Sequence, residues 1–139
     1  MRTAVPLNAI ERQALNDVLD DEYKSHATYR QVIADHGPIR PFINIVEAEA
    51  RPVGALLALF TAYGIAAPAD RWTGATPRFA SVHDACVSAA QGEIDNVALD
   101  DKLLASTQRP DVLAVYHALR AASLDRHVPA FRRCAQRPL

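Results

Sequence analysis

The chain has 139 residues, half of them hydrophobic, and its 15 lysine and arginine residues nearly balance 16 acidic ones. A chain of this length forms one domain with a substantial core, so we expect a single domain over residues 1–139. The near-neutral charge, with acids and bases interspersed, argues against a nucleic-acid partner. No apolar run reaches the roughly 20 residues that span a bilayer, so no membrane partner is expected. Two distant cysteines and no hydrophobic leader are typical of a cytoplasmic protein.

Apolar residues recur at helical spacing in four segments, which predict helices over about 8–36, 43–63, 81–106 and 111–134. Asn8 together with Glu11 has the form of a capping box at the start of the first helix. The segment between the second and third helices is rich in proline, glycine and threonine, and Trp72 is expected to anchor this loop on the helices. Amphipathic helices joined by mostly short connections pack best around one core. The predicted fold is therefore an all-α, antiparallel four-helix bundle.

A proline lies inside the second predicted helix. Pro52 has no amide hydrogen to donate to the carbonyl of Ala48, and its ring crowds that carbonyl, which normally costs about 3 kcal/mol and kinks a helix. We therefore predict a bend next to Glu49, with the Ala48 carbonyl left without its usual partner. Pro129 interrupts the fourth helix in the same way, late in its course.

Each predicted helix carries a titratable side chain within its apolar stripe, and these side chains form the candidate site: Glu22, Glu49, Glu93 and His127. A buried carboxylate is costly unless it is paired, protonated or bound to a metal. Unpaired carboxylates that share one interior cannot all stay ionised. A divalent cation resolves this conflict, because carboxylates with an imidazole suit iron, manganese or zinc, and bundle cores accommodate such sites.

Without a cation, two arrangements could satisfy the cluster. Either one glutamate is protonated near neutral pH and hydrogen-bonded to another, or Arg51 turns inward to pair with them. His26 lies one turn from Glu22 but about 10 Å along the helix axis from the level of Pro52. We interpret His26 as a histidine at the edge of the core, hydrogen-bonded to a neighbour, rather than as a ligand. Tyr29 and Tyr116 could hydrogen-bond to the cluster, and core packing is the preferred interpretation. Asp95 is interpreted as solvated, and His36, His83 and His117 as surface or helix-end residues.

Several short motifs follow one another along the chain. They comprise Glu22 to Tyr29; Gly37, Phe42, Asn44, Ile45, Glu49 and Arg51; Tyr63, Gly64 and Ile65; Glu93 and Asp95; and His127, Ala130 and Phe131. In this order and spacing the chain resembles the ferritin-like di-iron carboxylate superfamily, in an uncharacterised prokaryotic branch related to rubrerythrin and erythrin. The resemblance spans residues 22–131. It implies a ferritin-like bundle with Glu22, Glu49, Glu93 and His127 as metal ligands.

The chain departs from that family pattern at Pro52, where the pattern has a histidine three residues after the second-helix glutamate. Proline cannot ligate a metal, so this glutamate–histidine pair is broken. Leu124 stands three residues before His127, so no second pair exists on the fourth helix. The remaining carboxylates and imidazole could hold one metal or a weakly bound pair. The expected cofactor is iron or another divalent metal (Fe, Mn or Zn), or none if the site is a relic.

The two cysteines are predicted to lie close together at one end of the bundle. Cys86 precedes Glu93 by seven residues, and Cys134 follows His127 by seven. In an antiparallel pair of helices with Glu93 level with His127, the two thiols are therefore level as well, with Cα atoms within about 10 Å. Free thiols are the expected state in a cytoplasmic protein.

Two functions from different classes remain open. One is a metal-dependent oxidoreductase or iron-handling protein, in which a reduced metal meets oxygen or peroxide between the helices. The other is a non-catalytic ferritin-like scaffold that has lost its metal site and acts as a partner-binding module or homo-oligomer. The three in-stripe glutamates favour the first function, and Pro52 favours the second. The residues alone do not decide whether the chain is an enzyme.

Overall fold

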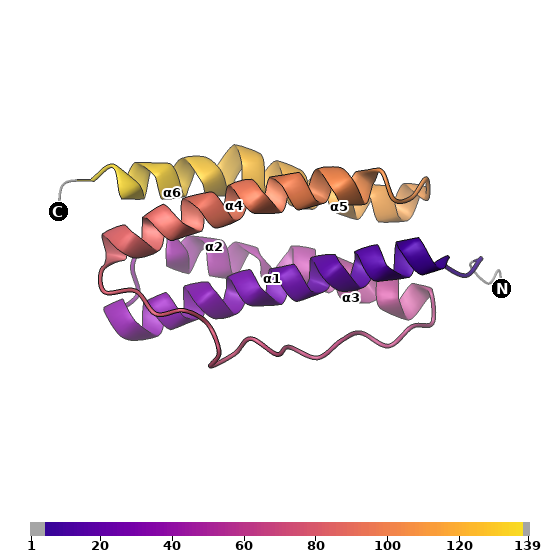
Figure 1. The fold of residues 1–139 in the computed structure, drawn as a ribbon, viewed down its shortest axis with the longest axis horizontal. Coiled ribbons are helices and arrows are strands. Elements are labelled where there is room, and N and C mark those ends of the chain that lie inside the picture. Colours follow the sequence, from indigo (N-terminus) through magenta and orange to yellow (C-terminus); the bar gives the residue numbers. More distant parts are fainter. Residues whose placement is uncertain (1–4, 138–139) are drawn as a thin grey trace.

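The computed structural model describes residues 5–137, and within them it contains helices and no β-strand. The helices pack side by side along the long axis of the molecule (Figure 1). In chain order they are α1 (Ala9–His36), α2 (Phe42–Ala48), α3 (Ala50–Ala62), α4 (Val82–Leu104), α5 (Pro110–Ala122), the π-helix η1 (Ser123–His127) and α6 (Val128–Ala135). The predicted all-α helical bundle is confirmed, and the outer boundaries of each predicted helix lie within two residues of the observed ones.

The first helix begins and ends where local chemistry dictates. The side chain of Asn8 accepts a hydrogen bond from the amide of Glu11, and the Glu11 carboxylate accepts one from the amide of Asn8. This predicted capping box satisfies amides that the first helical turn leaves unbonded. The helix stops at Gly37, whose φ of 96° is a left-handed conformation that glycine adopts without a side-chain clash.

Residues 5–137 form four helical arms, namely α1, α2 with α3, α4, and α5 with η1 and α6. The second arm is interrupted at Glu49. Helix α2 ends at Ala48 and α3 begins at Ala50, and Glu49 adopts a turn between them. Pro52 accounts for the break, because it has no amide to donate to the carbonyl of Ala48. The bend predicted next to Glu49 is therefore confirmed. Its consequence is that a buried carboxylate stands at the junction of two helices rather than inside one.

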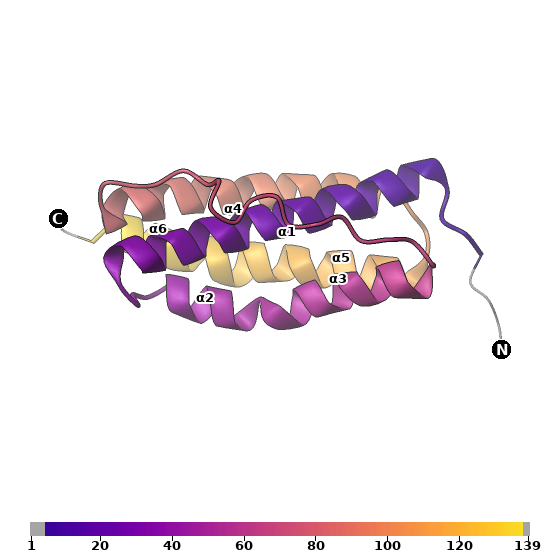
Figure 2. The same ribbon diagram turned by 90° about the horizontal axis from the view of Figure 1, so that it is seen from below.

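Residues 63–81 form a long connection that runs along the molecule beside α1 (Figure 1, Figure 2). The indole N–H of Trp72 donates to the carboxylate of Asp20, and Arg71 forms an ion pair with the same carboxylate. Further along, Arg78 pairs with Asp35 near the end of α1. Trp72 thus anchors the loop on α1 as predicted, and it does so through its polar edge.

The last arm runs from α5 to α6 and contains one π-helical turn, η1. Four of its buried residues, Leu119, Ser123, His127 and Phe131, are spaced by four. Each four-residue step on an α-helix overshoots a full turn by about 40°, so this spacing would drift off the buried face. The wider π turn takes up the drift and keeps His127 pointing inward. The predicted interruption near Pro129 is present, but its π geometry was not foreseen.

The interior consists of two hydrophobic clusters with a polar layer between them. Leu15, Leu56 and Tyr116 belong to the cluster nearer the described N-terminal end, and Phe42 and Phe131 belong to the other. Each arm passes from one cluster to the other through buried polar residues: Glu22 and His26; Glu49; Glu93 and Asn96; Ser123 and His127. Apolar packing thus encloses the polar layer from both ends of the bundle, where the local dielectric is low.

The cysteines lie together in the second hydrophobic cluster. Cys86 of α4 and Cys134 of α6 have Cα atoms 5.8 Å apart, so the predicted register is confirmed. The expectation of free thiols is wrong, because the two residues form a disulfide and no cysteine is free in the part of the chain that the structure describes. That expectation rested on the cellular compartment, whereas the level register of two inward stripes brings the Cα atoms within the disulfide range of about 4.4–6.8 Å.

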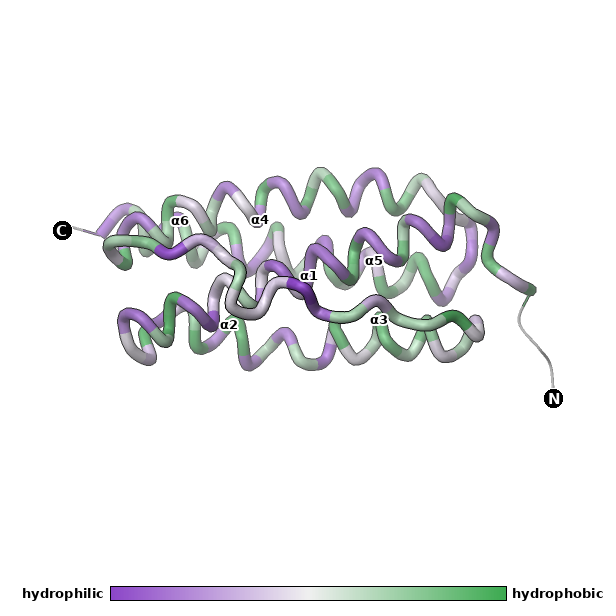
Figure 3. Tube along the Cα trace, turned by 60° about the horizontal axis from the view of Figure 1, so that its bottom comes forward, coloured by the Kyte–Doolittle hydropathy of each residue, from purple (hydrophilic) through white to green (hydrophobic). Residues whose placement is uncertain are grey.

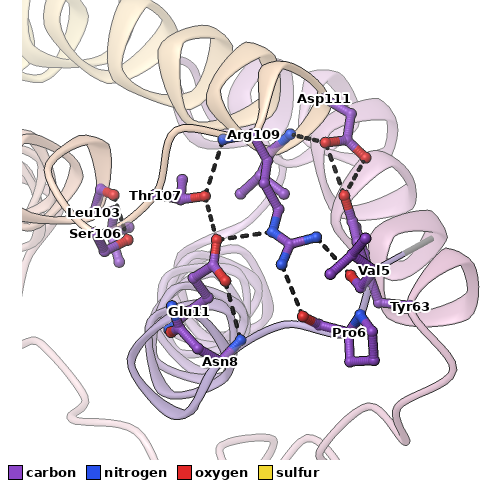
Figure 4. Close-up of polar contacts among 11 residues, drawn as sticks. Val5, Pro6, Asn8, Glu11, Tyr63, Leu103, Ser106, Thr107, Arg109 and Asp111 are labelled. Atoms are coloured by element: carbon purple, nitrogen blue, oxygen red, sulfur yellow. Dashed lines mark hydrogen bonds and ion pairs between the residues drawn. The ribbon is translucent and has the colours of Figure 1, made fainter.

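A hydrogen-bonded corner joins the α4–α5 connection to the start of α1 (Figure 4). The guanidinium of Arg109 donates to Glu11 at 2.9 Å, and the hydroxyl of Thr107 donates to the same carboxylate at 2.6 Å. Arg109 also donates to the backbone carbonyls of Val5 and Pro6. The hydrogen bond from Arg109 is the main reason why the pKa of Glu11 falls from 4.5 to about 2.

Hydrophilic and hydrophobic residues alternate along each helix (Figure 3). This alternation is what an amphipathic helix needs to bury one face and solvate the other. Within residues 5–137, no helix is both long enough and apolar enough to cross a membrane.

Candidate metal centre

The four residues predicted from the helical stripes lie together in the polar layer. Glu22 comes from α1, Glu49 from the turn between α2 and α3, Glu93 from α4, and His127 from η1. Their exposed fractions are 6%, 5%, 1% and 5%, in that order, so each side chain is enclosed by the bundle. The predicted inward orientation of all four residues is therefore confirmed.

Glu49 stands at the centre of the cluster. Its Oε2 lies 3.2 Å from Nε2 of His26, and its Oε1 lies 3.4 Å from Nδ1 of His127. Burial raises the pKa of Glu49, but hydrogen bonds with His26 and Glu22 and the nearby His127 outweigh burial and hold that pKa below its usual value. Glu49 thus stays ionised, and each of its oxygens faces a different imidazole.

Glu93 is fixed by three side chains. The hydroxyl of Tyr29 donates to Oε1 at 3.0 Å, the amide of Asn96 donates to Oε2 at 3.3 Å, and Nδ1 of His127 lies 3.1 Å from Oε1. The interpretation of Tyr29 as core packing alone is therefore wrong. Its ring does pack among aromatic residues of the second cluster, but its hydroxyl is a polar contact of the centre. The sequence interpretation also missed Asn96, which follows Glu93 by three residues and so lies one turn away on α4.

Glu22 is the least satisfied member of the cluster. Its Oε2 is buried and has no hydrogen-bond partner among the described residues. Burial raises the pKa of Glu22 well above 4.5, and the charge of Glu49 together with a hydrogen bond to it raises this pKa further. Without a cation, burial and the charge of Glu49 thus favour the protonated form of Glu22, in line with the first of the two predicted arrangements. Arg51 is exposed, so the second arrangement, with this side chain turned inward, is wrong.

Two groups of three side chains have the spacing of metal ligands, and Glu49 belongs to both. They are Glu22, His26 and Glu49, and Glu49, Glu93 and His127. In each group one ligand atom per residue lies within 4.8 Å of the others. Carboxylates and imidazoles together suit iron, manganese and zinc. This donor set and the unpartnered oxygen of Glu22 fit divalent cations.

His26 is the member of the cluster that the sequence interpretation set aside. It is 6% exposed and contacts Glu49, so the predicted hydrogen bond to a neighbour is present. Its assignment to the edge of the core is wrong. That assignment compared the level of His26 along the helix axis with the level of Pro52, where the family pattern has a histidine. The relevant comparison is with Glu49, which His26 contacts. The signal that could have found it is its spacing from Glu22, since side chains four residues apart share a helix face.

Further acids beside the cluster also hold protons more tightly than usual. Burial is the main cause that raises the pKa of Asp100 to about 7, and it raises the pKa of Asp21 to about 6. Both shifts include repulsion from Glu93, so the layer contains more carboxyl groups than it can ionise.

The residues predicted to be non-functional lie where expected, with Tyr116 in the core, Asp95 and His117 exposed, and His36 and His83 in terminal helical turns.

The fold and the cluster define an all-α helical-bundle protein with buried carboxylates and imidazoles. Neither a protein-family model nor a curated protein matches the sequence. The chain is similar to the solved structure of hypothetical protein MJ0754 from Methanococcus jannaschii, with a TM-score of 0.83, 23% identity, and coverage of 97% of this chain and 85% of that one. It is also similar to the conserved hypothetical protein rv2844 from Mycobacterium tuberculosis, with a TM-score of 0.79, 18% identity and 94% coverage of both chains. At these identities the likeness establishes the fold alone.

Proposed function

We propose that this protein is a ferritin-like metal-binding protein whose polar layer holds two divalent ions, with Glu49 common to both ligand groups. The observation that carries the proposal is the position of Glu49, which directs one oxygen toward His26 and the other toward His127. A carboxylate that only stabilises the fold needs one cationic partner. Glu49 instead connects two ligand groups, and it is the only residue shared between the two triads found within residues 5–137.

The charge of the layer supports a cation there. Glu22, Glu49 and Glu93 share a nearly dry interior with two imidazoles, and Asp21 and Asp100 lie close enough to be perturbed by Glu93. A divalent ion would replace the proton on Glu22 and would give its buried Oε2 a partner. Metal binding thus removes the largest unsatisfied polar feature of the cluster.

The proposed reaction class is metal-dependent redox chemistry or iron handling. Iron or manganese, when bound, would supply one-electron chemistry toward oxygen or peroxide. The chain's own contribution is to hold the ligands: Tyr29 and Asn96 fix the orientation of Glu93 from outside the ligand groups. Phe42 and Phe131, both 0% exposed, exclude water from the side of the layer that faces the disulfide.

The connectivity supports a ferritin-like arrangement of two antiparallel pairs, α1 with α2–α3 and α4 with α5–α6. Short connections join α1 to α2 and α4 to α5, whereas residues 63–81 run along α1 as a long crossover. Ferritin-like bundles have one such crossover, and they project carboxylates and histidines inward from facing helices. Pro52 occupies the position of the family's histidine, and we propose that His26 supplies an imidazole from α1 instead.

A non-catalytic scaffold is the second candidate, and one observation favours it. Contacts of His26 with Glu49, and of His127 and Tyr29 with Glu93, already satisfy most polar atoms of the layer without an ion. A fully bonded polar network can serve to fix how helical arms pack. In that case the protein would be a partner-binding or oligomer-forming module.

Metal analysis of protein purified without chelator, followed by anaerobic Mn²⁺ titration, separates the two candidates. We expect two ions per chain in the wild type, one after Glu22→Gln or Glu93→Gln, and none held tightly after Glu49→Gln. Glu47→Gln is the matched control, because Glu47 is an exposed carboxylate two residues from Glu49. A wild-type protein that binds no metal would leave the scaffold as the function.

A further inference from the structure

A basic pocket lies between the start of α2 and the η1–α6 segment. Its volume is about 400 Å³, and the polar residues that line it are Arg40, Asn44, Arg126, His127, Arg133 and Arg137. No aspartate or glutamate lines it. A pocket of this size lies in the range of about 300–1,000 Å³ that is typical of small-molecule sites.

The arginines of this pocket have no acidic partner among the described residues, as is also true of Arg12, Arg30, Arg51 and Arg132. Arg40, Arg126, Arg133 and Arg137 form no ion pair within residues 5–137. Elsewhere, Arg71, Arg78, Arg109 and Arg120 are each paired with an aspartate or glutamate. The formal net charge of the chain is −1, so the positive charge at the pocket is a local concentration and not an overall excess. Guanidinium groups brought together without carboxylates repel one another, and a bound anion would relieve that repulsion.

His127 belongs both to this pocket and to the carboxylate cluster. Its Nδ1 faces Glu93 and Glu49, while its ring forms part of the pocket wall. A molecule held by the arginines would therefore lie against a side chain of the proposed metal centre. The apolar part of the wall, Ile45 and Ala130, leaves room for a carbon skeleton beside the charged group.

We propose that this pocket binds the carboxylate or phosphate group of a small anionic molecule. Guanidinium groups are planar forks that donate paired hydrogen bonds to carboxylate and phosphate oxygens. Arg40, from the α1–α2 connection, and Asn44, from α2, act from one wall, and Arg126 and Arg133 act from the opposite wall, so an anion between them links the two arms. The binding itself needs no metal. Its role as the substrate site of the centre rests on the proposed function, and it assigns that substrate to the class of small organic or inorganic oxyanions.

Isothermal titration of the full-length, metal-free chain tests the pocket, with inorganic phosphate, pyrophosphate and succinate as probes at fixed low ionic strength. Saturable binding of one anion per chain is expected for at least one probe. Arg133→Gln should lose a hydrogen bond to the charged probe, so the Kd of that probe should rise about tenfold. Arg40→Gln should have the same effect from the opposite wall. Arg132→Gln is the matched control, because Arg132 is exposed on the same helix but does not line the pocket. We expect this control to stay within about twofold of the wild-type Kd.

Preference for phosphate or pyrophosphate over succinate would assign the pocket to phosphate groups, and the reverse preference would assign it to carboxylates. Absence of saturable binding by all three probes would overturn the proposal, as would equal weakening in Arg132→Gln and Arg133→Gln. Mn²⁺ titration of the same variants keeps the two proposals separate, because Arg133→Gln should bind metal like the wild type. Anion binding without metal binding would refute the proposed function and leave the pocket proposal in place. Metal binding without anion binding would refute the pocket proposal and leave the proposed function in place.

Discussion

Replacing Glu11 by glutamine tests the corner that joins the α4–α5 connection to α1, since the substitution keeps the side-chain shape and removes its charge. The hydrogen bond from Arg109 is the main cause that lowers the pKa of Glu11 from 4.5 to about 2. Each pKa unit corresponds to about 1.4 kcal/mol, so the ionised form is stabilised by at most about 3 kcal/mol. The side chain of Arg109 is 23% exposed. Solvent screening therefore reduces the expected loss in Glu11→Gln to about 1–2 kcal/mol.

The pH dependence of this loss follows from the direction of the pKa change. The folded-state pKa of Glu11 lies below the unfolded value, so its contribution to stability is complete above about pH 5 and is lost as the pH falls toward 2. The difference in unfolding free energy between the wild type and Glu11→Gln should therefore be largest at pH 7. At pH 3 it should fall to about half or less.

Urea unfolding followed by circular dichroism at pH 7 and pH 3 measures this difference. Asp17→Asn is the matched control, because Asp17 is an exposed acid on the same helix, and its effect should stay within about 0.5 kcal/mol at both pH values. A loss in Glu11→Gln that is no larger than in the control, or that is the same at pH 7 and pH 3, would refute the assignment of the corner as a charge-dependent clamp.

Reducing the Cys86–Cys134 disulfide, whose cysteines are 48 residues apart, should lower the unfolding free energy by about 2–4 kcal/mol in urea titrations, and an unchanged midpoint would contradict this. Pro52→His places an imidazole one helical turn from Glu49, so Mn²⁺ affinity should rise by about tenfold; no gain would mean that the break at Glu49 keeps the new ring away. In metal-free protein, Asp100→Asn should raise the free energy of unfolding by about 1–3 kcal/mol at pH 8 and by little at pH 4. The folded-state pKa of about 7 lies above 3.8, so the stability from protonated Asp100 is present below pH 3.8 and lost as the pH rises through 7; equal effects at both pH values would refute this.

The helices and the first members of the site could be predicted because their signals are local. Capping residues, glycine stops and apolar periodicity depend on neighbours within one or two turns, and they located the outer helix boundaries to within two residues. A glutamate inside an apolar stripe must face the core of whatever the helix packs against. For that reason Glu22, Glu49 and Glu93 could be placed inward before any contact between helices was known.

The remaining contacts depend on how the arms are rotated and aligned, which no single helix records. Tyr29 and His26 share the inward face of α1, yet which carboxylate each one meets follows from the level of Glu49 and Glu93 on other arms. The π turn that holds His127 has no established residue signature, and it is explained only by the four-residue spacing of buried side chains that the completed bundle requires.

The melting temperature with and without Mn²⁺, at pH 7 and pH 5, tests most directly whether the polar layer binds a divalent cation. Binding needs ionised carboxylates and neutral imidazoles, so it competes with the proton on Glu22 and weakens as the pH falls. At a free metal concentration of about 100 times the Kd, binding contributes about 2.7 kcal/mol. For a chain of 139 residues this corresponds to a rise of about 9 °C at pH 7. We predict a smaller rise at pH 5 and almost none at either pH in Glu49→Gln, whereas a wild-type melting temperature that metal leaves unchanged at both pH values would contradict the metal centre.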